Sequence, residues 1–175
     1  MEYINLVNLE GKRLGKIEKI KAHKEKKLHL AFSILVVNQN KEILIHKRNS
    51  NKYHSPGLWT NTCCSHPKFG EDLEIATHRR LKEEMGFDCK IEKVFDFVYK
   101  EEFENGLTEY EFDNVFVGRY NGEIIKPDEN EVSEYKWVSF SELIKDISKY
   151  PNKYTVWFKI ILNKIQDKKF DIFGG

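Results

Sequence analysis

The chain has 175 residues, of which 40% are hydrophobic, a size that suits one domain with a substantial core. Its 29 basic and 28 acidic side chains almost cancel, leaving a formal net charge of +1. This balance argues against a protein that binds nucleic acid or an anionic membrane through an overall basic surface, although it allows a local basic pocket for a small phosphate.

The N-terminal residues and the cysteines indicate a soluble protein of the cytoplasm. Residues 1–5 show no basic leader followed by an apolar core, so we expect no secretory signal. No segment reaches the roughly 18 consecutive apolar residues that cross a bilayer. Cys63 and Cys64 are adjacent in a set of 3 cysteines, which makes a poor disulfide framework. We expect reduced thiols and no membrane partner, and the sequence gives no indication of the oligomeric state.

The first third of the chain is predicted to form strands. Two short apolar alternations favour a hairpin over residues 1–18, and the charged residues 19–27 are predicted to be a loop or a frayed turn. The sequence HLAFSILVV at 29–37 predicts a buried strand, and a second strand is expected at 42–47 after a polar turn. The polar residues 47–56 are expected to be irregular.

The remainder of the chain adds helices to the predicted sheet. The strongest helix prediction is 71–85, where Leu73, Ala76 and Leu81 give a partial apolar stripe and Gly86 is placed to end the helix. The other expected elements are strands at 90–100, 110–120 and 135–138, a helix that starts with a capping box at 139–142, and a helix at about 153–166. Strands alternating with a few helices predict an α/β (α+β) fold, a mixed sheet with helices on both faces.

The nine residues from Trp59 to Pro67, WTNTCCSHP, bring together two thiols, an imidazole and four small hydrogen-bonding side chains. They lie between a Pro-Gly turn and the best predicted helix. So many reactive side chains in a short stretch indicate a functional site.

Histidines and carboxylates suggest a metal site. His23 and His29 flank the entry to the buried strand, and His66 belongs to the WTNTCCSHP stretch. Glu109 and Glu111 are two residues apart, so on a strand they would point to the same side. Imidazoles with carboxylates suit Mn²⁺, Zn²⁺ or Mg²⁺. A solvated surface with scattered His and Glu is the alternative that the spacing leaves open.

The predicted helix carries a second unusual feature. Glu83 and Glu84 lie in its last turn, where acidic side chains oppose the helix dipole. This conflict suggests a function for one of them, while pairing of Arg80 with Glu84 across one turn is the simpler explanation.

The segment 71–87 resembles the Nudix box, GX5EX7REUXEEXGU, where U is apolar. The residues that match it are Glu71, Arg79, Leu81, Glu83, Glu84, Gly86 and Phe87. Two positions depart, since Ser65 replaces the first Gly and Arg80 replaces a Glu that belongs to the Mg²⁺-binding cluster of Nudix hydrolases. The second departure argues against hydrolysis of a diphosphate.

Together with HLAFS at 29–33, WTNTCCSHP at 59–67 and Glu109-X-Glu111, the chain resembles the type 1 isopentenyl-diphosphate isomerases over roughly residues 1–165. The resemblance implies one Nudix-like isomerase domain, 1–175, with a mixed sheet between helices. It also implies interconversion of isopentenyl and dimethylallyl diphosphate, a small-molecule substrate, in isoprenoid synthesis. The alternatives are a Nudix hydrolase, which leaves Cys64 without a role, and a non-catalytic binding module.

The resemblance also implies site residues. The ligands of one divalent ion (Mn²⁺, Zn²⁺ or Mg²⁺) would be His23, His29, His66, Glu109 and Glu111. The acid–base groups would be Cys64 and Glu111, with Tyr99 orienting Glu111. Glu84 would help to hold a second Mg²⁺ against the substrate diphosphate. The remaining substrate contacts would be Lys19, Arg48, Lys52 and Arg80 at the phosphates and Trp157 over the hydrocarbon. Cys63 is expected to pack away from the site, and no role is assigned to His46, His54 or His78.

The reaction explains why these residue types are needed. Moving an unactivated double bond adds a proton at one carbon and removes one from another, which requires two proton-transfer groups on opposite faces. The intermediate resembles a tertiary cation, which an indole face stabilises by about 2 kcal/mol when water is excluded. Trp157, Trp59 and Tyr99 are the aromatic candidates, and each could instead belong to the core.

Overall fold

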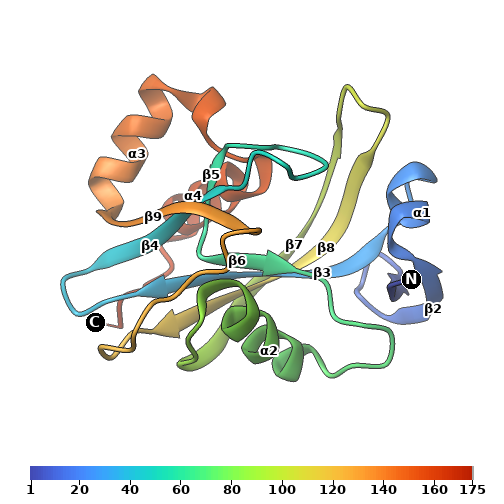
Figure 1. The fold of residues 1–175 in the computed structure, drawn as a ribbon, viewed down its shortest axis with the longest axis horizontal. Coiled ribbons are helices and arrows are strands. Elements are labelled where there is room, and N and C mark those ends of the chain that lie inside the picture. The colour runs from blue at the N-terminus through green and yellow to red at the C-terminus, as the bar shows by residue number, and fades with distance from the viewer. Residues whose placement is uncertain (175) are drawn as a thin grey trace.

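A computed structural model describes residues 1–174 of the protein and is drawn in Figure 1. In these residues the strands form one mixed sheet: β1 (Tyr3–Val7), β2 (Arg13–Glu18), β3 (His29–Val37), β4 (Glu42–Arg48), β5 (Trp59–Thr60), β6 (Cys63–Ser65), β7 (Lys90–Glu102), β8 (Thr108–Arg119) and β9 (Val132–Ser139). The helices are α1 (Lys19–Lys24), α2 (Leu73–Met85), α3 (Phe140–Lys149) and α4 (Val156–Lys168), with a 3₁₀ turn, η1, at Pro151–Lys153.

Strand β3 is the centre of the sheet. All nine of its residues are buried, as expected for an apolar run covered on both faces. It runs parallel to β8, with His29 opposite Glu111, and antiparallel to β1, β4 and β6. Segments far apart in the sequence, including the predicted metal-binding residues, therefore meet along β3.

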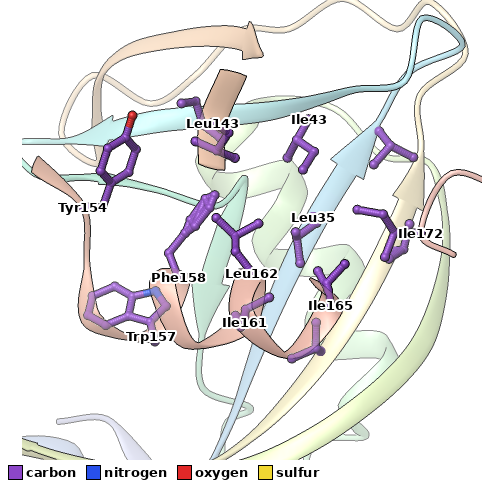
Figure 2. Close-up of a cluster of buried hydrophobic side chains, with 14 of the residues drawn as sticks. Leu35, Ile43, Leu143, Tyr154, Trp157, Phe158, Ile161, Leu162, Ile165 and Ile172 are labelled. Carbon is purple, nitrogen blue, oxygen red and sulfur yellow. The ribbon is translucent and has the colours of Figure 1, made fainter. Parts of the chain in front are cut away.

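Two apolar clusters cover the two faces of the sheet. One lies between α2 and the sheet and contains Phe32, Leu44 and Leu81. The other lies under α3 and α4, where Leu35, Ile43, Leu143, Phe158 and Ile161 pack together, with Trp157 at the end of the group (Figure 2). Helices on opposite faces of a mixed sheet confirm the predicted fold class (Figure 1).

Helix α2 follows its predicted signals closely. It begins two residues later than predicted because the Asp72 side chain accepts from the N–H groups of Glu74 and Ile75 and so caps the helix. Gly86 ends it in the left-handed conformation, at φ 76°, with its N–H donating to the carbonyl of Lys82. A Cβ at Gly86 would lie 2.1 Å from the carbonyl oxygen of Lys126, so this position requires glycine.

The prediction of a loop or frayed turn at residues 19–27 was wrong. Residues 19–24 form α1, which the side chain of Glu18 caps by accepting from the N–H groups of Ile20 and Lys21. Ala22 and His23 face the interior, while the lysines stay largely outside. Because the lysines give this short helix a charged outer side, the sequence did not indicate a helix.

The other predicted elements are present with shifted ends. The capping box at Ser139 is confirmed: its hydroxyl accepts from the N–H of Glu142 and donates to the Glu142 carboxylate. The hairpin of β7 and β8 is longer than predicted and turns at Gly106, and β9 begins three residues earlier than expected. Strands β5 and β6 were not predicted, because runs of two and three residues carry no periodicity. Among residues 1–174, none of the helices has the length and apolar character needed to cross a membrane.

Candidate active site

A pocket opens beside β3, β6 and β8. Of the predicted site residues, the structure places these on its walls: Lys19, Arg48, Lys52, Cys64, His66, Arg80, Glu84, Tyr99, Glu109, Glu111 and Trp157. The two others, His23 and His29, lie directly against Glu109 and Glu111. The structure therefore brings all of the predicted site residues together.

The five predicted metal ligands form one buried cluster. Their ligand atoms all lie within 4.8 Å of one another, although they come from α1, β3, β8 and the segment after β6. The parallel register of β3 with β8 sets His29 beside Glu111, and the period of two along β8 turns Glu109 the same way. The alternative of a solvated surface does not hold for these buried residues.

The hydrogen bonds in the cluster leave nitrogen lone pairs facing inward. Nδ1 of His23 lies 2.6 Å from the carbonyl of Lys19, and Nδ1 of His29 lies 2.8 Å from that of Lys27, so both Nδ1 atoms donate. Each neutral ring then keeps a lone pair on Nε2, the arrangement typical of metal-bound histidines. Nε2 of His29 lies 3.2 Å from Nε2 of His66. Two facing imidazole nitrogens fit a shared cation better than a hydrogen bond between them.

The carboxylates complete this donor set. Oε2 of Glu109 is buried without any hydrogen-bond partner, which is costly unless a cation or water is bound there. Oε1 of Glu111 lies 2.8 Å from Nε2 of His66 and 3.5 Å from that of His29. Three imidazoles and two carboxylates fit a divalent metal ion.

Glu109 and Glu111 differ in charge. Burial raises the pKa of Glu111, and the ionised Glu109 beside it raises that pKa further, to about 8. Burial also raises the pKa of Glu109. Hydrogen bonds from Glu111, His23 and His54 outweigh this effect and hold the pKa of Glu109 well below its usual value. Burial also lowers the pKa of His66 to about 3, which keeps this imidazole neutral, as a ligand must be. One carboxyl group therefore holds a proton and the other holds the charge.

Tyr99 is placed to orient Glu111. Its hydroxyl lies 2.9 Å from Oε2 of Glu111 across the β7–β8 ladder, where the two residues are directly opposite. Burial raises the pKa of Tyr99 well above its ordinary value, so the hydroxyl keeps its proton and acts as a donor.

Cys64 and Cys63 point to opposite sides of β6. Cys64 is half-buried and lines the pocket, whereas Cys63 is fully buried in the cluster under α2, as predicted for it. Burial raises the pKa of the Cys64 thiol, and the Arg48 guanidinium opposes this only in part. At neutral pH Cys64 therefore rests as a thiol.

Charged side chains also line the pocket. Nζ of Lys52 lies 2.6 Å from a carboxylate oxygen of Glu131, and Arg80 pairs with Glu84 and, at 3.7 Å, with Glu131. Burial alone would lower the pKa of Arg80, but Glu84 raises it, so the guanidinium stays charged. The buried Arg48 donates to backbone carbonyls of the loop between β4 and β5. Guanidinium and ammonium groups in this arrangement can bind a diphosphate, and Glu84 can hold a cation against it.

Trp157 is the indole on the pocket wall. Its Nε1 donates to Asn61 Oδ1 at 3.2 Å, and its ring lies 5.3 Å from the guanidinium carbon of Arg48. Trp59, the other tryptophan candidate, is not among the residues lining the pocket and packs under Lys136 instead.

Sequence reasoning missed His54, which was assigned no role. The structure buries it on the pocket wall with Nε2 2.6 Å from Oε1 of Glu109, and burial lowers its pKa. It also missed Glu131. Both lie in polar loops and become site residues only through the fold. His46 and His78, in contrast, bond to the Thr62 carbonyl and to Asp88 away from the cluster.

Comparisons with known proteins agree with this geometry. The NUDIX domain family matches residues 27–158. The isopentenyl-diphosphate Delta-isomerase 2 of Photorhabdus laumondii is 50% identical over 163 residues, covering 93% of this chain and 91% of that protein. The isopentenyl-diphosphate Delta-isomerase of Burkholderia multivorans is 42% identical, with 93% of this chain and 92% of that protein covered.

Solved structures show the same fold at lower identity. A Deinococcus radiodurans protein superposes with a TM-score of 0.70 at 19% identity, covering 85% of this chain and 90% of its own. The MutT protein from Methanosarcina mazei superposes with a TM-score of 0.66, also at 19% identity, covering 82% of this chain and 96% of its own.

The sequence relatives narrow the family assignment further: the chain belongs to the NUDIX family and, within it, to the isopentenyl-diphosphate Delta-isomerases.

Proposed function

We propose that this protein interconverts isopentenyl diphosphate and dimethylallyl diphosphate by adding a proton to one carbon and removing one from another. The observation that carries the proposal is the pairing, in one pocket, of a half-buried thiol with a carboxyl group that holds a proton near neutral pH. Hydrolysis needs neither group. Double-bond migration needs both, one as the proton donor and the other, deprotonated, as the proton acceptor.

In the direction from isopentenyl diphosphate, the carboxyl group of Glu111 gives its proton to the terminal methylene, whose π electrons form the new C–H bond. Cys64 then takes a proton from the carbon next to the one bearing the diphosphate oxygen. The electron pair of the broken C–H bond forms the new double bond. This direction uses the thiolate of Cys64; burial raises the pKa of the thiol, and Arg48 opposes this in part. The thiol donates in the reverse direction. Tyr99 keeps the Glu111 carboxyl group oriented throughout.

Binding groups surround these two residues. We assign the diphosphate to Lys19, Arg48, Lys52 and Arg80, and the hydrocarbon end to the Trp157 face, where a cation-like species is stabilised. Glu131, now paired with Lys52 and Arg80, is expected to release them to the phosphates.

The cations fall into two sites. His23, His29, His66, Glu109 and Glu111 would hold Mn²⁺, Zn²⁺ or Mg²⁺, and Glu84 would hold a Mg²⁺ that accompanies the diphosphate. The first ion would fix Glu111 and increase the acidity of its protonated form. We further propose a single isomerase domain over 1–175 acting in the cytoplasm, because free cysteines suit a reducing compartment.

The test is to incubate purified protein with isopentenyl diphosphate and Mg²⁺ and to follow dimethylallyl diphosphate by NMR. We expect this product without release of phosphate. Release of monophosphate or inorganic phosphate instead would replace the isomerase by a Nudix hydrolase, and a folded, metal-loaded protein giving no product would overturn the proposal.

A further inference from the structure

His54 lies between two groups of site residues. It belongs to the loop joining β4 to β5, the loop that carries Lys52, and its Nε2 reaches Oε1 of Glu109 on β8 at 2.6 Å. No other side-chain contact between that loop and the metal-binding carboxylates is as short. None of the roles proposed above for the site residues depends on this contact of His54 with Glu109.

Tautomers show which imidazole donates to Glu109. Two imidazoles approach Oε1, His54 at 2.6 Å and His23 at 3.1 Å. Nδ1 of His23 donates to the Lys19 carbonyl, so Nε2 of His23 can donate to Oε1 only when the ring is charged, and it has no hydrogen to give when it binds a metal. Nδ1 of His54 lies 3.4 Å from the hydroxyl of Ser55, which can act as a donor, so Nε2 of His54 can keep its hydrogen. His54 makes the shorter contact and is the imidazole that can still donate to Oε1 when His23 binds the metal.

The His54 ring is held on several sides. It stacks on Phe103 with centroids 5.0 Å apart and meets the Trp157 ring edge-on at 5.7 Å. Arg48 donates to its carbonyl oxygen at 3.1 Å. The loop is also tied to the tip of the β7–β8 hairpin, where the Asn105 amide donates to the Tyr53 carbonyl at 2.7 Å. A ring fixed in this way can fix the carboxylate it contacts.

We propose that His54 is a positioning residue that holds Glu109 by donating from Nε2 to Oε1, which leaves the unpartnered Oε2 turned toward the metal cluster. The inference rests on the proposed metal site and adds a residue to its support. Partners of this kind behind a metal ligand contribute about 10–100-fold to metal affinity.

The test is titration of metal-free protein with Mn²⁺ by calorimetry, with folding checked by circular dichroism. His54→Phe keeps an aromatic ring against Phe103 and Trp157 but has no donor, and we expect Mn²⁺ affinity to fall about 10–100-fold. His54→Gln restores an N–H donor and should recover most of the loss. His54→Ala removes the donor without adding volume and gives the same comparison if the Phe variant misfolds. His78→Phe, a matched change at a histidine paired with Asp88, should bind Mn²⁺ like the wild type.

The outcomes separate the two proposals. Unchanged affinity in the folded Phe and Ala variants, or a Gln variant as weak as Ala, would overturn the positioning role while leaving the metal site intact. Absence of Mn²⁺ binding by the wild-type protein would overturn the metal site itself, and this inference with it.

Discussion

Replacing Cys64 tests the proton-transfer assignment most directly. The thiol is on the pocket wall, and the hydroxyl opposite it in the β3–β6 ladder, Ser33, already donates to Asp113 at 2.8 Å. The Ser33 hydroxyl is therefore not free to take over its task. A general acid–base group contributes about 10²–10⁴-fold, or roughly 3–5 kcal/mol of barrier, and we expect Cys64→Ala to lose at least this much turnover.

The adjacent cysteine is the matched control. Cys63→Ala removes the same atom from the cluster under α2, so it should lower stability slightly and leave turnover near that of the wild type. Turnover is measured by NMR on both variants, and elemental analysis should find the same metal content in both. Normal turnover by Cys64→Ala would refute the assignment of two proton-transfer groups, and equal losses at both positions would indicate a packing effect.

Three further predictions concern the surroundings of the site. Tyr99→Phe removes the donor to Glu111 and should lower kcat roughly tenfold or more with KM little changed, as steady-state kinetics can show. Gly86→Ala places a Cβ against the Lys126 carbonyl at positive φ and should cost about 2 kcal/mol or more, measured by urea unfolding. In metal-free protein the raised pKa of Glu111 means that the folded state binds the extra proton, so the free energy of unfolding should fall as the pH rises from 6.5 toward 8. The fall, relative to Glu111→Gln, is at most about 1.4 kcal/mol per pH unit, and a flat difference between the two unfolding curves would contradict it.

Sequence patterns predicted the longer strands of the sheet and α2, since these depend on apolar runs and caps that are local in the chain. The length of the β7–β8 hairpin and the helix at Lys19–Lys24 were not predicted, because their polar outer residues hide the buried ones. The site residues were predicted from sequence motifs. The fold then revealed further site residues that lie outside these motifs. The contact of His54 with Glu109 joins residues 55 apart, which no local pattern can indicate.

The arrangement of Glu109 and Glu111 answers a difficulty raised by the chemistry. A free carboxyl group is ionised at neutral pH, and a bound cation favours ionisation further, yet the reaction needs a carboxyl group that carries a proton. Two buried carboxylates on one side of a strand cannot both be ionised cheaply, so one of them takes a proton. The donors that surround Oε1 of Glu109, His54 among them, keep the negative charge on that residue. In the metal-free protein the proton therefore stays on Glu111, which lies 2.9 Å from the Tyr99 hydroxyl and shares the pocket with Cys64.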